Sequence, residues 1–376
     1  MERRGPLVGL KVLEFAAIGP VPFAGMLLSD LGADVVRIDR RGGAARGPQD
    51  VTFRGRRSVG LDLKAPSGAE AALRLMQRAD ALIEGFRPGV MERLGLGPEL
   101  ALARNPRLVY GRMTGWGQSG PLAKAAGHDL NFIALSGALH AIGPQAAPAI
   151  PLNLVGDYGG GALYLAFGLL AAVMHARATG EGQVVDCAMS DGAISLMAQM
   201  YGLHSTGDWA DQREANVIDG GAHFYNVYRC RDGEWISVAA PEPGFYQELR
   251  RLAGLQEEAF DAQWSAGQWP QLKGRMAEVF ATRTRAEWCA LLEGTDACFA
   301  PVLSLSEAPA HPHNRARGAF VSIDDIVQPA PQPKFSLTPG AVQGPAARAG
   351  AHNRDALSDW GLEPAEIDAL EQSGAL

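Results

Sequence analysis

The chain has 376 residues, of which 47% are hydrophobic and 20% are charged, and its formal net charge is −7. This length favours two domains, and the composition is typical of a globular protein with a large core. The negative net charge argues against nucleic-acid binding, which favours basic faces.

The first third of the chain alternates segments with strand and helix patterns. Apolar runs predict strands at residues 10–16, 34–39, 58–63, 81–85 and 107–114. The segments between them predict helices at residues 23–31, 68–79 and 93–105. Such alternation indicates parallel strands with helices packed on the sheet, and ligands then gather at the carboxyl ends of the strands.

The pattern changes after residue 114. Apolar helices are expected at residues 130–141 and 158–177, followed by a strand at 182–189. A smaller α+β unit is indicated by strands at 224–229 and 235–239 and by helices at 244–255, 269–281 and 285–293. Beyond Asn314 the chain is rich in proline and glycine, and we expect it to return over the first domain and end in a surface helix pair at 353–370.

These patterns predict an α/β protein with two domains. The large domain has a Rossmann-like parallel sheet, and its first part is expected at residues 1–190. A linker at 191–219 leads to the small α+β domain at 220–310, and residues 311–376 form a return linker and the C-terminal part of the large domain.

The sequence favours a cytoplasmic protein without membrane association. No signal peptide is indicated, because Lys11 and Glu14 interrupt the first apolar run. The most apolar stretch, residues 159–174, is shorter than the roughly 20 residues of a membrane span. The four cysteines lie far apart without CxxC spacing, which indicates reduced thiols. The C-terminal Gly374-Ala375-Leu376 is not a convincing peroxisomal address.

Residues 37–64 are basic within an acidic protein. Against three aspartates they contain eight basic side chains: Arg37, Arg40, Arg41, Arg46, Arg54, Arg56, Arg57 and Lys64. Arginine matches phosphate geometry, so a polyanionic small molecule such as a nucleotide-bearing cofactor is one interpretation, and a solvated loop is the other. The turn after the first strand lacks GxGxxG and no GxxxxGK[ST] occurs, which disfavours nicotinamide cofactors and P-loop chemistry.

Two side chains are candidate proton carriers. His128 precedes a helical pattern, where the helix dipole favours a neutral imidazole and backbone N–H groups can bind an oxyanion. Such a base suits proton abstraction next to a carbonyl, whereas the alternative is a histidine that caps or packs the helix. Asp157 precedes Gly159-Gly160-Gly161 and is either an N-cap or a catalytic group, and the glycines let a ligand or another helix come close.

Glu242 is a third candidate, held between two prolines after a predicted strand. It either stabilises a helix N-terminus or supports His128 through the second ring nitrogen. The other histidines form no HExxH or similar pattern, so no metal site is expected.

At these residues the chain resembles the α-methylacyl-CoA racemases of the family III CoA-transferase (CaiB/BaiF-like) superfamily. The similarity runs over nearly the whole chain, and its motifs are modest individually but specific in this order. They are Gly9–Glu14, Leu31–Arg37, Phe86–Arg93, Gly127-His128-Asp129, Asp219–Ala222, Glu242-Pro243 and Thr295–Val302.

The resemblance implies epimerisation of 2-methylacyl-CoA thioesters at the α-carbon through an enolate, without metal or redox cofactor. His128 and Asp157 would flank the α-carbon from opposite faces and exchange roles with substrate configuration. Glu242 would lie beside the partner subunit's catalytic histidine in an interlocked homodimer. The resemblance also assigns a set of CoA- and substrate-binding residues: Arg40, Gly60, Leu61, Asp62, Leu63, Gly85, Arg87, Arg93, Ala126, Gly127, Asp129, Leu130 and Asn131.

Two further expectations concern the substrate. The acyl pocket is expected among bulky apolar residues near the motifs, namely Trp116, Phe132, Met197, Tyr201, Trp209 and Phe224. The alternative activity on the same fold is a CoA-transferase in which Asp157 attacks the thioester as a nucleophile. Such a transferase would leave His128 and Glu242 without a role.

Overall fold

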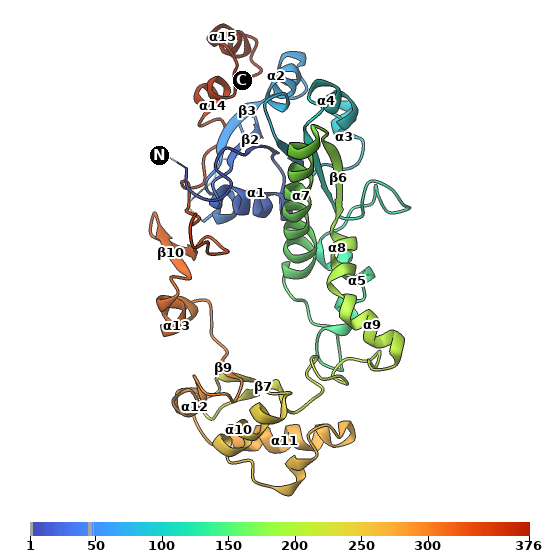
Figure 1. Ribbon diagram of the computed structural model, residues 1–376, viewed down its shortest axis with the longest axis vertical. Helices are drawn as coiled ribbons and strands as arrows, with labels where there is room; N and C mark the ends of the chain where they lie inside the picture. The colour runs from blue at the N-terminus through green and yellow to red at the C-terminus, as the bar shows by residue number, and fades with distance from the viewer. Residues whose placement is uncertain (1–2, 44–46, 48) are drawn as a thin grey trace. The chain divides into compact units, whose positions relative to one another are not determined.

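The computed structural model describes residues 3–43, 47 and 49–376, which form two compact units (Figure 1). Unit 1 comprises the chain up to Ser136, Leu152–Leu196 and Ala316–Leu376. Unit 2 comprises Gly137–Pro151 and Met197–Arg315. Each unit therefore contains segments from distant parts of the sequence.

Unit 1 is built on a six-stranded parallel sheet with the order β3-β2-β1-β4-β5-β6. The strands are β1 Lys11–Phe15, β2 Asp34–Arg40, β3 Arg57–Leu61, β4 Ala81–Glu84, β5 Val109–Thr114 and β6 Gln183–Ala188. This order is doubly wound, and it reverses between β1 and β4. The predicted α/β class with a parallel sheet is confirmed.

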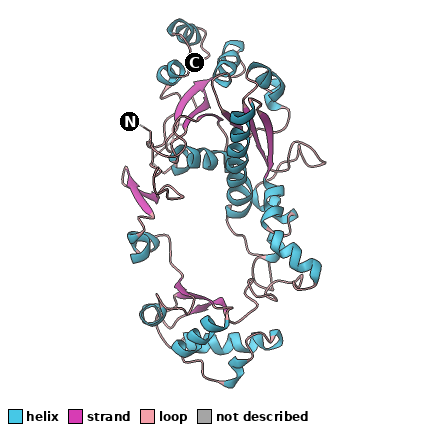
Figure 2. Ribbon diagram, in the orientation of Figure 1, coloured by secondary structure: helices cyan, strands magenta, loops and turns pink. Residues whose placement is uncertain are grey.

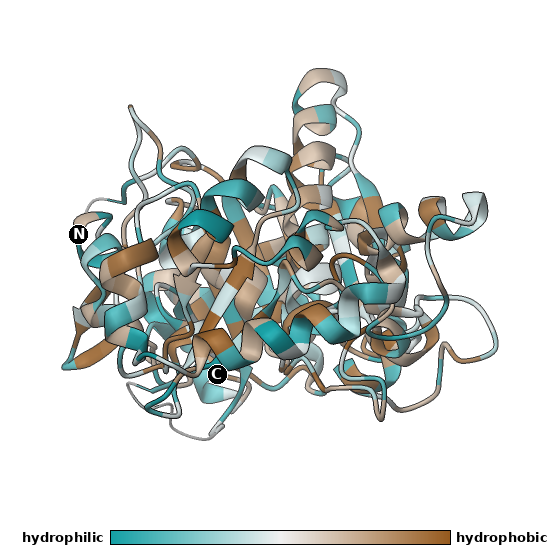
Figure 3. Ribbon diagram, turned by 90° about the horizontal axis from the view of Figure 1, so that it is seen from below, coloured by the Kyte–Doolittle hydropathy of each residue, from teal (hydrophilic) through white to brown (hydrophobic). Residues whose placement is uncertain are grey.

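Helices cover both faces of this sheet. The helices α2 Pro66–Met76, α3 Val90–Arg93 and α4 Pro98–Arg104 pack on one face, and α1 Pro20–Asp30 and α7 Tyr164–Thr179 pack on the other. Apolar and polar segments alternate along the helices, as the colours of Figure 3 show. Such alternation lets each helix bury one side against the sheet.

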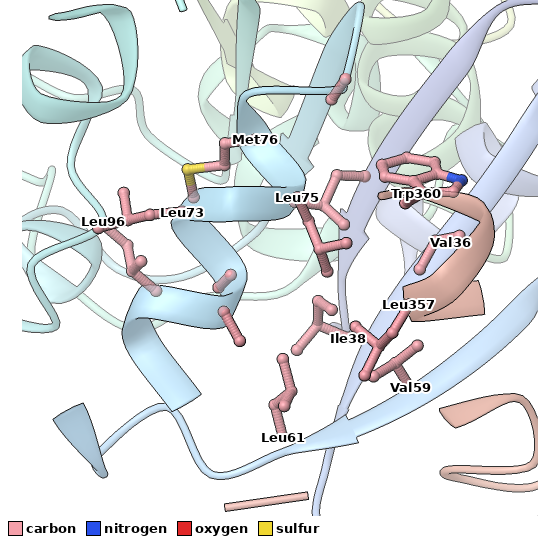
Figure 4. Close-up of a cluster of buried hydrophobic side chains, with 14 of the residues drawn as sticks. Val36, Ile38, Val59, Leu61, Leu73, Leu75, Met76, Leu96, Leu357 and Trp360 are labelled. Atoms are coloured by element: carbon pink, nitrogen blue, oxygen red, sulfur yellow. The ribbon is translucent and has the colours of Figure 1, made fainter. Parts of the chain in front are cut away.

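The C-terminal helices α14 Asn353–Asp359 and α15 Pro364–Gln372 belong to the first of these layers. Leu357 and Trp360 are almost fully buried and pack near strand residues such as Val36 and Val59 (Figure 4). The helix pair expected at 353–370 is therefore present, and each helix buries one face while the other face is exposed. Their apolar residues recur at helical spacing, which places them together on the buried face.

Two predicted helices are interrupted at glycines. The helix expected at 93–105 is divided into α3 and α4 where Gly95 has φ +70° and Pro98 starts the next helix. The helix expected at 130–141 is divided into α5 Asp129–Leu135 and α6 Ala138–Ala141, because Gly137 has φ +78°. A left-handed backbone at these positions cannot continue a helix.

The apolar helix expected at 158–177 begins earlier. A π-helical segment, η2 Leu154–Leu163, runs directly into α7, and together they form a helix of 26 residues. By length and composition alone this helix is long enough to cross a membrane, although half of its most apolar window is buried. It packs on β5 and β6 and against α8 Met189–Leu196.

Unit 2 contains a three-stranded antiparallel sheet covered by helices (Figure 2). Its elements are β7 Tyr225–Arg229, β8 Trp235–Ala239, β9 Phe299–Pro301, α9 Ala198–Thr206, α10 Pro243–Ala253, α11 Trp269–Phe280 and α12 Arg285–Leu292. A turn at Asp232-Gly233 connects the first two of these strands, which lie close to the predicted strands at 224–229 and 235–239. The short strand β9 and, in the return segment, α13 Pro312–Ala316 and the hairpin β10 Phe320–Ile323 and β11 Ile326–Pro329 were not predicted.

Candidate active site

His128 lies directly before α5, as its sequence pattern predicts. The Asn131 Oδ1 accepts the backbone N–H of His128 at 3.1 Å, which fixes the entry into the helix. Phe132, one turn further, packs edge-on against Trp116 with ring centroids 4.8 Å apart. A Cβ at Gly127 would lie 2.7 Å from the Phe132 ring, so the segment before His128 needs a glycine to approach this close.

Asp157 lies within η2 and is not the N-cap of an α-helix. The glycines that follow it bring η2 into backbone contact with α8: a Cβ at Gly192 would lie 1.8 Å from the Gly160 carbonyl oxygen. A Cβ at Gly160 would lie 2.6 Å from the Ala193 nitrogen. The close approach that the glycine run permits is therefore made by a second helix. π-Helical segments are rare in proteins and are found frequently at functional sites.

The carboxylate of Asp157 is half-buried in a polar setting. Its Oδ2 accepts a hydrogen bond from the Asn153 side-chain amide at 3.3 Å. Burial raises the pKa of the Asp157 carboxyl above its ordinary value, and the charge of Asp129 raises it further. The hydrogen bond from Asn153 and the nearby His128 act in the opposite direction on this pKa. A raised pKa makes the carboxyl a better proton acceptor when ionised and keeps more of it protonated near neutral pH.

The structure brings His128 and Asp157 to the lining of one cavity of about 590 Å³. The cavity lies at the carboxyl ends of β1, β4 and β5, where the strand order reverses. Its walls include the apolar side chains Phe86, Met113, Trp116, Phe132 and Met189. Two groups that can exchange protons therefore face a largely apolar space at the position where doubly wound sheets bind ligands.

A second cavity of about 790 Å³ lies beside β2 and β3 at the same edge of the sheet. It is lined by Arg40, Arg41 and Lys64, and Phe86 lines both cavities. The bend that places Phe86 there is held by Glu84, whose Oε2 accepts the Phe86 N–H at 2.7 Å. Glu84 is itself fully buried and paired with Arg112, so this bend is rigidly anchored.

The remaining binding residues implied by the resemblance are divided between these cavities. Leu61, Asp62 and Leu63 line the second cavity, and Gly85, Arg87, Ala126, Gly127 and Asn131 line the first. Four residues line neither cavity: Gly60, Arg93, Asp129 and Leu130. The N–H of Gly60 instead donates to Asn353 Oδ1 at 2.9 Å.

Most of the basic stretch has a structural role. Each of four arginines forms an ion pair, namely Arg37 with Asp39, Arg54 with Asp30, Arg56 with Glu14, and Arg57 with Asp34. The first three pairs are almost completely buried. These four arginines therefore form neither a single phosphate-binding cluster nor a solvated loop. Arg46 lies outside the residues that the structure describes. Of the described members of the stretch, Arg40, Arg41 and Lys64 are the basic residues that line the second cavity.

The expected acyl pocket is only partly assembled. Trp116 and Phe132 line the cavity that contains His128 and Asp157. Met197, Tyr201 and Trp209 line a different cavity of about 310 Å³ within unit 2. Phe224 lines none of these cavities, because it is fully buried in the aromatic core of unit 2.

Glu242 lies at the start of α10 in unit 2, where it is exposed. Sequence reasoning missed Phe86, Asn153 and the segment Ile18–Val21, which leads into α1, among the site residues. Ligands of doubly wound sheets bind beyond the carboxyl ends of the strands. This rule points to Phe86, which follows β4, and to Ile18–Val21, which follows β1. No sequence signal points to Asn153.

Within the described ranges, no group of three or more His, Cys, Asp or Glu side chains is arranged to hold a metal ion.

The chain is similar in sequence to proteins of CoA-transferase family III. The chain is 43% identical to the α-methylacyl-CoA racemase of Mus musculus over 366 residues, which cover 96% of this chain and 95% of that protein. It is 42% identical to the human α-methylacyl-CoA racemase, with 97% and 96% covered. It is also 30% identical to the succinyl-CoA–L-malate CoA-transferase β subunit of Chloroflexus aurantiacus, with 94% of each covered.

Solved structures share the fold. A CaiB/BaiF family protein from Brucella suis has a TM-score of 0.82 at 25% identity and covers 95% of this chain and 100% of that chain. A Mycobacterium tuberculosis structure has a TM-score of 0.78 at 28% identity, with 94% and 99% covered. CoA-transferase family III itself matches residues 7–353. The chain therefore belongs to CoA-transferase family III and is an enzyme of that family.

Proposed function

We propose that this enzyme interconverts (2R)- and (2S)-2-methylacyl-CoA thioesters. The observation that carries the proposal is the shared cavity of His128 and Asp157, two groups able to move protons. The identity of 43% to a protein named α-methylacyl-CoA racemase supports the same activity. The thioester substrate class follows from the family.

The chemistry requires one proton to leave the α-carbon and another to arrive on the opposite face. One of His128 and Asp157 removes the α-proton as a general base, and the C–H electron pair moves into the thioester carbonyl to form an enolate. The other group then donates its proton to the α-carbon from the opposite face. The N-terminal end of α5 beside His128 is a candidate site for the enolate oxygen, since first-turn N–H groups have no acceptor within their helix and the helix dipole favours negative charge there.

CoA is proposed to lie along the carboxyl edge of the sheet. Arg40, Arg41 and Lys64 place positive charge in the second cavity, where they suit the phosphates of the nucleotide. Phe86 borders both cavities, so the pantetheine chain would pass this ring to bring the thioester to His128 and Asp157. No protein-bound metal or redox cofactor enters this reaction.

A homodimer is part of the proposal. The helix formed by η2 and α7 carries an apolar stripe opposite its buried face, in which Leu163 is 52%, Phe167 73% and Met174 73% exposed. These residues recur at helical spacing and form one continuous strip, which is typical of a subunit contact. The exposed Glu242 would then serve the partner's site, as the family resemblance implies.

The direct test is incubation with (2R)- or (2S)-2-methylacyl-CoA in deuterium oxide. Loss of optical purity together with one deuterium at the α-carbon is expected, and His128→Ala and Asp157→Asn should each abolish inversion while CoA still binds. Transfer of CoA to an added carboxylate, which becomes the new thioester while the 2-methylacyl group is released as its carboxylate, would instead identify a CoA-transferase if Asp157 is required and His128 is dispensable. Full inversion by either variant would refute the two-base mechanism.

A further inference from the structure

The side chain of Asp129 connects the segments that carry the two proton carriers. Asp129 follows His128 directly in the sequence, and its Oδ2 accepts the backbone N–H of Asp157 at 2.7 Å. Its side chain is buried, with the residue only 6% exposed, and it lines neither cavity. The Asp129 side chain therefore contacts the protein backbone, whereas the family resemblance implies only that this residue takes part in substrate binding.

The surroundings of Asp129 are adapted to this contact. A Cβ at Gly156 would lie 2.6 Å from Asp129 Oδ2, so only glycine fits beside the carboxylate. The Asp157 N–H, which donates to Asp129, belongs to the first turn of η2. The π-helical hydrogen bonds begin only at the next residue, where the Tyr158 N–H donates to the Asn153 carbonyl. Without the Asp129 side chain the partly buried Asp157 N–H would lose its acceptor, which costs free energy.

On the basis of the proposed function, we infer that Asp129 is a positioning residue that ties the Asp157 backbone to the chain position next to His128. The hydrogen bond fixes the start of η2 against the start of α5. The two proton carriers are thereby held at a set separation across the substrate α-carbon. Asp129 also adds a negative charge near Asp157, which contributes to the raised pKa of that carboxyl, although burial is the larger cause.

Two variants separate these contributions. Asp129→Ala removes both the acceptor and the charge, and a misplaced catalytic group costs about 10–100-fold in kcat for inversion. Asp129→Asn keeps an oxygen that can accept the Asp157 N–H, so its kcat should be much closer to wild type. Its loss of charge should move the acidic limb of kcat/KM to lower pH. KM should change by less than about twofold in both variants, since the side chain does not line either cavity.

The distinguishing readout is proton exchange without inversion. If only Asp157 is displaced, His128 still removes and returns the α-proton on its own face. In Asp129→Ala, one enantiomer of an α-deuterated substrate should then exchange its deuterium for solvent hydrogen without a change of configuration. The rate of this exchange should be close to wild type, while inversion is slow. A matched control is Glu99→Gln, which changes an exposed acidic residue in the first turn of α4 and should behave as wild type.

The outcomes keep the two proposals apart. A wild-type enzyme that neither inverts nor exchanges the α-proton refutes the proposed function, whatever Asp129 does. Given an active wild type, equal losses of exchange and inversion in Asp129→Ala, at an unchanged unfolding temperature, overturn the positioning role. Wild-type inversion by Asp129→Ala overturns it too, as does an Asp129→Asn variant as slow as the alanine variant.

Discussion

The backbone contact between Gly192 and Gly160 should couple stability to activity. In Gly192→Ala the new Cβ would meet the Gly160 oxygen at 1.8 Å, its carbon at 2.5 Å and its Cα at 2.8 Å. All three atoms are backbone, so no side-chain rotation relieves the clash and α8 must move away from η2. Overpacking of this kind costs about 1–3 kcal/mol, and a rigid backbone contact favours the upper end.

The displacement should also reach Asp157, which lies one helical turn before Gly160. We expect Gly192→Ala to lower the thermal unfolding temperature and to reduce kcat for inversion at least tenfold, because the catalytic carboxylate moves. Gly202→Ala is the matched control: Gly202 lies within α9, a Cβ added there would have nothing within 4 Å, and alanine should stabilise the helix by about 0.5–1 kcal/mol. Wild-type unfolding and turnover in Gly192→Ala would refute the reasoning.

Three further outcomes are expected. Asp30→Ala leaves the buried Arg54 guanidinium without its carboxylate, so it should destabilise the fold by about 3–5 kcal/mol in denaturant titrations. Arg40→Ala should weaken CoA binding about tenfold by calorimetry with little change in kcat, whereas the exposed Arg317→Ala should leave CoA affinity unchanged. In the direction in which Asp157 acts as the base, kcat/KM should fall as the pH drops through its raised pKa, above the usual aspartate value of about 3.9. An acidic limb at the usual value would contradict this assignment.

The parallel sheet could be predicted because apolar, often β-branched residues cluster in its strands and the segments between the strands have helical patterns. The strands expected at 34–39 and 107–114 correspond to β2 at Asp34–Arg40 and β5 at Val109–Thr114. Buried parallel strands are apolar on both faces, so their pattern contrasts sharply with the flanking turns. The short strand β9 has no such contrast, since three residues pairing with β8 leave too little sequence for a pattern.

The site could be predicted only where local sequence determines structure. His128 before α5 is a local pattern, and it was correctly placed at the helix start. The π-helical setting of Asp157 depends on contact with α8, which lies about 30 residues away in sequence and leaves no local signal. The basic stretch misled for the same reason: Arg56 pairs with Glu14, 42 positions earlier, and charge counting cannot reveal such a partner.

The location of the cavities follows from the topology of the sheet. The chain leaving β1 enters α1 on one face, and the chain leaving β4 enters α3 on the other. Because β1 and β4 are neighbours, their exits diverge and open a crevice between them. Gly85 lets the β4 exit pass close to Val21, since a Cβ there would lie 2.9 Å from that side chain. Phe86 then lies between a part of the crevice lined by Arg40, Arg41 and Lys64 and a part that contains His128 and Asp157. Under the proposed function, this bend separates the phosphate-binding part from the part where the proton transfers take place.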